Sequence, residues 1–284
     1  MDYESLLEAF YLRILRPGDI CMDVGAHAGR HMIPMARKIA GGAGGMVLAF
    51  EPIPICHARL AERLLTPELN DITVQLSPVA LSDTDGRAEF VLALDLPEYS
   101  GLRERVYDGP TRLERIDVET RRLDSFGDKL ARLRYIKIDV EGGEWNVIRG
   151  GAATIARLRP VISFEFGQNS YAGYGVAPGD VFDFFVAQDY RVFDIRGRSL
   201  GRQAFEASAI RQEVWDYVAA PKELEGAVAR ALSGKRSWGD RLRAVFRRRG
   251  NLAERRTATG ASPAADQQRA RARCGDVCWC IPRL

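Results

Sequence analysis

The chain of 284 residues contains no run of 18 apolar residues, so its sequence predicts no transmembrane helix. Its first five residues include two acidic ones and lack the positive charge that begins a signal peptide. Five cysteines form no even disulfide framework, because Cys21 and Cys56 stand far apart and the other three crowd the C-terminal end. These absences together lead us to expect a cytoplasmic protein.

A strong net charge is also lacking, since the whole chain carries only +3. The charge is nevertheless uneven, because residues 235–284 hold thirteen Lys or Arg against four Asp or Glu. The remaining residues, 1–234, are therefore slightly acidic. A slightly acidic body argues against nucleic acid as the substrate of the folded part.

Residues 235–284 are rich in Arg, Gly, Ala, Ser and Thr and have weak apolar patterning, which predicts a disordered tail. A basic amphipathic patch inside it leaves open a peripheral contact with an anionic membrane or an acidic partner. The patch consists of Arg241, Leu242, Arg243, Val245, Phe246, Arg247, Arg248 and Arg249. The tail's cysteines, Cys274, Cys278 and Cys280, lack the histidines or second cluster that a four-ligand zinc site needs.

Short apolar runs alternate with helical stretches along residues 16–234, after an amphipathic helix predicted for residues 1–15. This alternation is typical of βαβ units and a parallel sheet. Strands are predicted at 20–24, 46–50, 72–76, 88–94, 116–123, 136–140, 161–166, 191–195 and 214–219, and helices at 30–39, 55–65, 145–158, 181–189 and 222–232. We therefore predict a Rossmann-like α/β fold with a seven-stranded, mostly parallel sheet and helices on both faces.

A glycine-rich loop follows the first predicted strand. Gly25 and Gly29 flank His27, and glycines let a backbone approach a ligand closely. The spacing differs from the Gly-x-Gly-x-x-Gly of a dinucleotide site. Asp23, two residues before the first glycine, suits the ammonium group of a methionine moiety and would repel a diphosphate. The loop therefore indicates a binding site for S-adenosylmethionine.

Two further segments extend this predicted cofactor site. Glu51 closes the second predicted strand, where its two oxygens can each accept a hydrogen bond from a ribose hydroxyl. NAD enzymes share this feature, and a helix-start carboxylate is the alternative explanation. Ser82 and Asp83 are candidates to bond the adenine amino group, although their segment also fits a plain turn.

Three carboxylates, Asp139, Glu141 and Glu144, lie within six positions at the end of the strand predicted at 136–140. Alternation places Lys137 and Asp139 on one face of that strand. A hydroxyl nucleophile must lose its proton as it attacks, and the candidates to accept it are Asp139, Glu141 and Glu165, with His27 of the loop as a further one. Asp139 is also expected to contact the cofactor. Paired carboxylates can alternatively hold a divalent metal, although the sequence offers no clear ligand set. Glu144 begins a helix and is explained by the helix dipole.

Taken together, these blocks closely resemble the FkbM-family methyltransferases over about residues 16–220. The blocks are 23–29 (DVGAHAG), 50–52 (FEP), 80–83 (ALSD), 122–124 (RLD), 135–144 (YIKIDVEGGE) and 160–165 (PVISFE). The resemblance implies a class I methyltransferase fold, S-adenosylmethionine as donor, and O-methylation of a hydroxyl on a sugar, glycan or secondary metabolite. In that family the position of His27 is variable, so the resemblance does not support a catalytic role for His27.

Two other functions remain open at the level of sequence. An NAD-linked oxidoreductase shares the fold and the residue Glu51, while an inactive cofactor-binding partner subunit would retain the loop without chemistry. Acceptor choice is expected to depend on two loops, 95–114 and 168–179.

Overall fold

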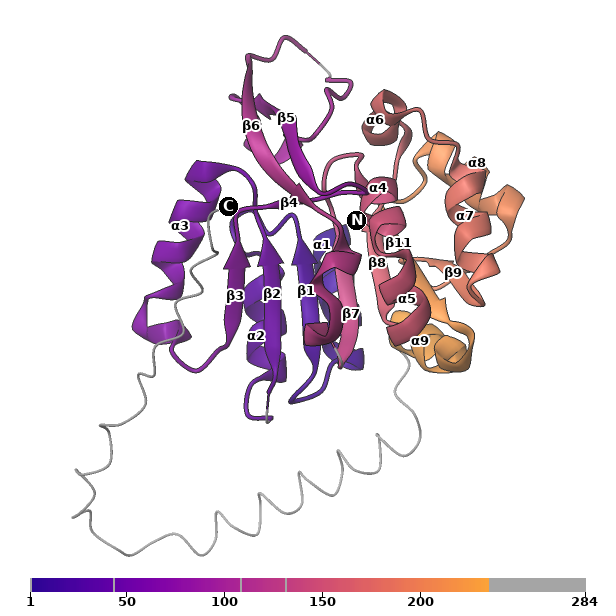
Figure 1. The fold of residues 1–284 in the computed structure, drawn as a ribbon. Helices are drawn as coiled ribbons and strands as arrows, with labels where there is room; N and C mark the ends of the chain where they lie inside the picture. The colour runs from indigo at the N-terminus through magenta and orange to yellow at the C-terminus, as the bar shows by residue number, and fades with distance from the viewer. Residues whose placement is uncertain (1, 43, 108, 131, 235–284) are drawn as a thin grey trace, which may run out of the picture. The chain divides into compact units, whose positions relative to one another are not determined.

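The protein is built around an eight-stranded β-sheet with strand order β10-β9-β11-β8-β7-β1-β2-β3 (Figure 1). A computed structural model describes residues 2–42, 44–107, 109–130 and 132–234. The five strands from β8 to β3 pair in parallel, whereas β11 runs antiparallel to both β8 and β9, and β10 antiparallel to β9. The carboxyl ends of the parallel strands therefore meet at one edge of the sheet.

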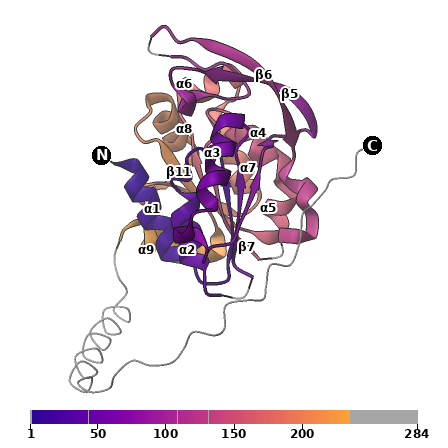
Figure 2. The ribbon, with the colours of Figure 1, turned by 90° about the vertical axis from the view of Figure 1, so that its left-hand side faces the viewer.

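The strands of this sheet are β1 (Ile20–Val24), β2 (Met46–Phe50), β3 (Val74–Ser77), β7 (Leu133–Ile138), β8 (Val161–Glu165), β9 (Tyr190–Asp194), β10 (Ser199–Leu200) and β11 (Asp216–Pro221). The helices are α1 (Tyr3–Ile14), α2 (Met32–Ile39), α3 (Pro54–Leu64), α4 (Glu144–Gly150), α5 (Ala152–Leu158), α6 (Gln168–Tyr171), α7 (Pro178–Ala187), α8 (Arg202–Arg211) and α9 (Glu225–Leu232). Helices α1, α2 and α9 cover one face and α5 the other (Figures 1 and 2). The predicted α/β fold is confirmed.

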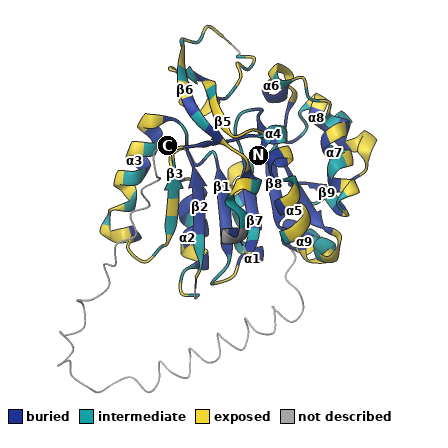
Figure 3. Ribbon diagram, viewed as in Figure 1, coloured by how far each residue is buried: buried dark blue, intermediate teal, exposed yellow. Residues whose placement is uncertain are grey.

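Burial follows this layering. The central strands are almost wholly buried, whereas the outward sides of α3, α7 and α8 are exposed (Figure 3). Every residue of β1 is buried, which agrees with the continuous apolar runs expected of a strand that is covered on both faces. Helix α1 belongs to the same core, because its Leu7, Phe10 and Tyr11 are buried there.

A second, three-stranded sheet accounts for the segment between β3 and β7. Its strands are β4 (Ala80–Leu81), β5 (Gly86–Ala93) and β6 (Leu113–Arg121), in the order β4-β6-β5. Thus the stretches predicted as strands at 88–94 and 116–123 do form strands, but they pair with each other instead of joining the main sheet. Their connection was predicted to be a loop near the site, and it contains a short 3₁₀ helix, Pro97–Tyr99.

Other differences from the sequence prediction have local causes. The short strand β10 pairs antiparallel with β9 at the edge of the main sheet, which therefore has eight strands instead of the seven predicted. The helix predicted for 145–158 is divided at Gly150 and Gly151 into α4 and α5. Among the described residues, no helix is both long and apolar enough to span a membrane. The predicted tail, residues 235–284, lies outside the described residues.

Candidate active site

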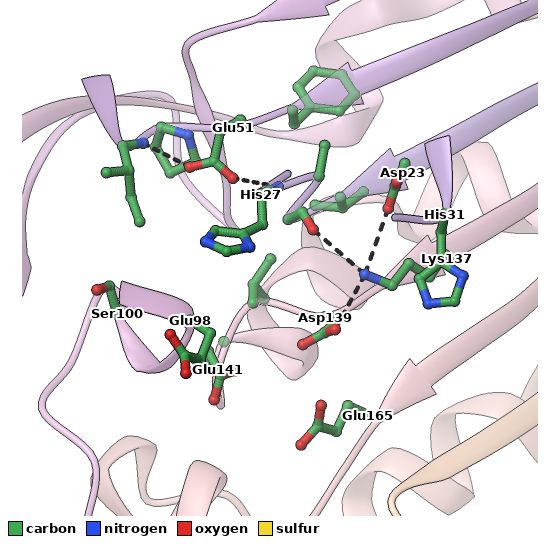
Figure 4. Close-up of a pocket in the computed structure, with 18 of the residues that line it drawn as sticks. Asp23, His27, His31, Glu51, Glu98, Ser100, Lys137, Asp139, Glu141 and Glu165 are labelled. Atoms are coloured by element: carbon green, nitrogen blue, oxygen red, sulfur yellow. Dashed lines mark hydrogen bonds and ion pairs between the residues drawn. The ribbon is translucent and has the colours of Figure 1, made fainter. Parts of the chain in front are cut away.

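A cavity of about 580 Å³ opens at the carboxyl ends of the parallel strands. It is lined by the ends of β1, β2, β7 and β8, the beginning of β11, and the loop that includes Pro97–Tyr99. The predicted site residues among its lining are Asp23, Gly25, His27, Glu51, Asp139, Glu141 and Glu165. Seven candidates from four separate segments of the sequence therefore share one cavity, and Figure 4 shows all of them except Gly25 as labelled side chains.

The loop after β1 is held tightly against the neighbouring strand ends. Gly25 has φ +82°, and a Cβ built there would lie 1.8 Å from the backbone oxygen of Asp139. The amides of Gly25 and Ala26 both donate to the carbonyl of Phe50 at 3.0 Å. A side chain at position 25 is therefore excluded both by conformation and by space. Gly29 (φ +77°) closes the turn, its amide donating to the carbonyl of Ala26 at 2.7 Å.

Glu51 connects this loop to the end of β2. Its Oε2 accepts the amide of His27 at 2.7 Å, and its Oε1 accepts the amide of Ile53 at 2.9 Å. The side chain is 3% exposed, and burial raises its pKa to about 7 although both backbone hydrogen bonds oppose the shift. A carboxylate offers about four acceptor sites, so two remain for a ligand.

Asp23 is a buried carboxyl group at the end of β1. It is 1% exposed, and neither Oδ1 nor Oδ2 has a hydrogen-bond partner among the described residues. The nearest cation is Lys137, whose Nζ lies 3.5 Å from Oδ1. Burial raises the pKa of Asp23, and Lys137 opposes that rise. A buried carboxylate of this kind fits a cationic ligand in the cavity, because burying it without a partner is costly.

Three carboxyl groups face each other beyond the end of β7. One oxygen each of Asp139, Glu141 and Glu165 lies within 4.8 Å of the other two. Lys137 Nζ lies 3.1 Å from Oδ2 of Asp139, and the guanidinium of Arg105 pairs with Glu141. Each carboxyl group therefore has a different electrostatic environment.

These environments separate the pKa values of the three groups. Burial raises the pKa of Asp139, but Lys137 outweighs it and leaves that pKa lowered. Burial, followed by the charge of Asp139, raises the pKa of Glu141 to about 9 and that of Glu165 well above its usual value. The environment thus favours the ionised form of Asp139, which accepts hydrogen bonds, and the protonated form of Glu165, which donates one.

A divalent metal is not favoured by this arrangement. Lys137 and Arg105 already contact two of the three carboxyl groups, and burial favours the protonated forms of Glu141 and Glu165, so the group is not an open set of anionic ligands. The geometry instead suits hydrogen bonding to a polar ligand.

Glu144 stabilises the turn after β7 by hydrogen bonds, a role that was not expected from its position at the start of a helix. Its Oε1 accepts the amides of Val140 and Gly142, at 2.9 and 3.1 Å, and so fixes the turn that carries Glu141. It is 1% exposed, and burial raises its pKa to about 7.

Three predicted cofactor residues do not line the cavity: Gly29, Ser82 and Asp83. The amide of Ser82 donates to the carbonyl of Arg121, and Asp83 pairs with Arg149 of α4. The preceding residues Ala80 and Leu81 line the cavity instead. Of the two loops expected to select the acceptor, the first contributes residues 97–100 and 102 to the lining, and the second, 168–179, contributes none.

Sequence reasoning missed several lining residues that come from distant segments. Asp2, Tyr3 and Glu4 close one side of the cavity, and Glu4 pairs with His31 at 2.5 Å. His31 also contacts the hydroxyl of Tyr11 at 3.2 Å. Asp216, the first residue of the antiparallel strand β11, and the preceding Trp215 also line the cavity. No local sequence pattern identifies these residues. Lys137 also lines the cavity, and it could have been predicted, because strand alternation places it on the same face as Asp139.

Comparison with known proteins matches residues 23–192 to the FkbM methyltransferase domain. The 2-O-methyltransferase NoeI of Sinorhizobium fredii (strain NBRC 101917 / NGR234) is 28% identical over 182 residues, which are 56% of this chain and 68% of NoeI. The methyltransferase sdnD of Sordaria araneosa is 29% identical over 158 residues, or 45% of this chain and 59% of sdnD.

Solved structures include the methyltransferase FkbM of Methylobacillus flagellatus KT, with 14% identity and a TM-score of 0.44 over 77% of this chain and 55% of that one. An O-methyltransferase from Bacillus cereus, solved in complex with SAH, has 12% identity and a TM-score of 0.38 over 78% and 82% of the two chains. The family match alone spans more than half of the sequence and includes the loop after β1, Glu51 and the carboxyl cluster after β7. The chain belongs to the FkbM family of S-adenosylmethionine-dependent methyltransferases.

Proposed function

We propose that the protein transfers a methyl group from S-adenosylmethionine to a hydroxyl oxygen of a sugar, glycan or secondary metabolite. The observation that carries this proposal is a single cavity in which Asp23 and Glu51 share a lining with Asp139 and Glu165. NoeI, a 2-O-methyltransferase by name, supports oxygen as the methylated atom.

The donor fits the part of the cavity next to the loop after β1. Asp23 provides a buried carboxyl group whose oxygens accept no hydrogen bond from the described residues and can accept from the ammonium group, and Glu51 has two acceptor sites left for the ribose hydroxyls. Ile53, Ala80 and Leu81 give an apolar wall for the adenine ring. When bound, the donor supplies an electrophilic methyl group.

The charge of the cavity favours an acceptor without anionic groups. Nine of its lining residues are Asp or Glu, and two are Lys or Arg. Both cations are paired within the described residues, Arg30 with Glu8 and Lys137 with two aspartates. Carboxyl groups bond well to hydroxyls and repel phosphates and carboxylates, so a neutral polyhydroxylated acceptor is favoured.

The remaining chemistry is positioning and removal of one proton. A displacement at a methyl carbon gains much of its rate from alignment of the reacting atoms. Asp139, held ionised by Lys137, accepts the proton that the acceptor hydroxyl loses. Glu165, protonated, donates a hydrogen bond that orients the acceptor.

The test is incubation of the protein with methyl-labelled S-adenosylmethionine and a panel of acceptors, followed by mass spectrometry. Paired acceptors differ in charge only: a neutral saccharide, its uronic acid and its phosphate. We expect label on a hydroxyl oxygen of neutral members. Tight donor binding without product from any member would favour a non-catalytic partner subunit, and binding of NAD in place of S-adenosylhomocysteine would favour an oxidoreductase.

A further inference from the structure

Lys137 is a buried cation at the junction of the donor and acceptor parts of the cavity. It lies on β7 directly opposite Asp23 of β1 in the parallel register, and its side chain is 6% exposed. Its Nζ lies 3.1 Å from Asp139 Oδ2, 3.5 Å from Asp23 Oδ1 and 3.4 Å from the carbonyl oxygen of Gly25 (Figure 4). The three contacts come from three separate segments: the end of β1, the loop after it, and the residues after β7.

Burying a lysine is costly unless its charge is compensated. Here burial alone lowers the pKa of Lys137, but Asp139 and then Asp23 outweigh it, so the pKa is raised and the ammonium form is retained. A hydrophobic residue of similar length would fill the space without that cost. The positive charge of Lys137 therefore has a role that packing alone does not explain.

We propose that Lys137 is a positioning residue of the methyl-transfer site, its ammonium group bridging the donor-side carboxyl group of Asp23 and the acceptor-side carboxyl group of Asp139. The inference rests on the proposed function, which gives these two carboxylates their ligands. Lys137 also contacts the carbonyl of Gly25, in the loop that borders the donor.

Loss of the ammonium group changes the protonation of Asp23. The other titratable groups that interact with Asp23 or Lys137 come from every element around them: Glu4 and Tyr11 of α1, His31 before α2, Glu51 after β2, Tyr135, Asp139 and Glu141 of the β7 segment, and Asp216 of β11. Without Lys137, burial and the nearby carboxylate of Asp139 raise the pKa of Asp23 further, and this favours the protonated form of Asp23. A protonated Asp23 no longer attracts the ammonium group of the donor.

The test is titration calorimetry of the full chain with S-adenosylmethionine and with S-adenosylhomocysteine, at pH values from 7.5 to 9.5. We expect Lys137→Met to weaken binding of both ligands by at least about tenfold at pH 7.5. Part of that affinity returns as the pH rises and Asp23 ionises. Lys137→Arg, which keeps the charge, retains most of the affinity, and Lys222→Met, at an exposed ion pair, serves as the matched control.

A double variant separates positioning from packing. With Asp23→Asn already present, Lys137→Met is expected to cost less than it costs alone, and the pH dependence disappears, because the two groups act as a pair. Lys137→Gln replaces Lys137→Met if the latter does not fold, as judged by circular dichroism.

Wild-type affinity in Lys137→Met across the whole pH range would overturn the inference. A loss that is independent of pH and equally large in Lys137→Arg would also overturn it, since that result indicates packing only. Failure of the wild-type protein to bind either ligand would instead count against the proposed function.

Discussion

The backbone amide of His27 donates a hydrogen bond of 2.7 Å to Oε2 of Glu51. This contact joins the loop after β1 to the end of β2, so a residue expected to bind ribose also shapes the loop. His27 itself has φ +43°, a left-handed conformation that is uncommon for a residue with a side chain. Its importance in the structure therefore comes from its backbone, which agrees with the variable residue at this position in the family.

Gly25 is expected to be indispensable for folding. Gly25→Ala combines a left-handed φ of +82° with a contact of 1.8 Å to the backbone of Asp139. Gly41 is the matched control, with φ +80° and no heavy atom within 4 Å of its added Cβ. We expect Gly41→Ala to cost about 1–2 kcal/mol of unfolding free energy, and Gly25→Ala at least about 2 kcal/mol more. Urea denaturation measures both, and equal costs would contradict the close approach.

Glu144 is expected to make stability depend on pH. Its folded pKa, about 7, lies above the ordinary value of 4.5. Between pH 4.5 and about 7, Glu144 is ionised in the unfolded chain and protonated in the folded chain. Its contribution to the free energy of unfolding is therefore full below pH 4.5 and is lost as the pH rises to about 7. Glu144→Gln keeps an oxygen for the amides of Val140 and Gly142, and it should remove this loss.

The companion variant tests the turn itself. Glu144→Ala leaves the amides of Val140 and Gly142 without their acceptor and is expected to cost about 1–3 kcal/mol for each one left unpaired. Unfolding free energies from pH 4.5 to 8 check both variants. If Glu144→Gln is as destabilised as Glu144→Ala at pH 8, the oxygen of Glu144 does not fix the turn.

Replacement of Asp139 and of Glu165 by the corresponding amides is expected to affect catalysis differently. Asp139→Asn removes the proton acceptor and should lower kcat by about 10²–10⁴-fold. Glu165→Gln resembles the protonated form that burial and Asp139 favour, so its loss should stay below about tenfold. Wild-type activity should decline as the pH rises through the raised pKa of Glu165, and Glu165→Gln should lack that decline. Steady-state kinetics with an acceptor identified from the panel measure these changes. Equal losses of kcat in Asp139→Asn and Glu165→Gln would contradict the assigned roles.

Arg105 is expected to contribute to turnover of the acceptor and not to binding of the donor. It is 7% exposed at its side chain, pairs with Glu141, and lies 4.4 Å from the ring centre of Tyr99, a cavity residue. Arg105→Ala leaves Glu141 buried without its cation, so kcat/KM for the acceptor should fall at least about tenfold while donor affinity is retained. Arg87→Ala, at an exposed pair with Asp117, is the control and should change neither quantity. Loss of donor affinity in Arg105→Ala would contradict this role.

Much of the fold followed from local patterns. The strand predicted at 20–24 and the loop with Gly25 and Gly29 are where the sequence placed them, because apolar runs and glycines act over a few residues. The second sheet was not separated from the first, since alternation identifies a strand without identifying its partner. The helix Arg202–Arg211 was missed because its apolar residues have little helical periodicity.

The site was predicted in part for the same reason. Carboxylates at strand ends could be located, since parallel strands bring their carboxyl ends to one edge. The direction of a side chain within a turn was not predictable, and Asp83 points to Arg149 on α4 instead of into the cavity. The pairing of Glu4 with His31 depends on how α1 packs, and no local pattern contains that information.

The central claim is that Asp23 and Glu51 bind S-adenosylmethionine in this cavity, and calorimetric titration at pH 8 tests it most directly. Asp23→Asn and Glu51→Gln should each weaken binding by about tenfold or more, the cost of one hydrogen bond to a charged group. Asp83→Asn, a charge removal outside the cavity lining, should leave the affinity within about twofold of wild type. Wild-type affinity in both folded variants, Asp23→Asn and Glu51→Gln, would contradict the account.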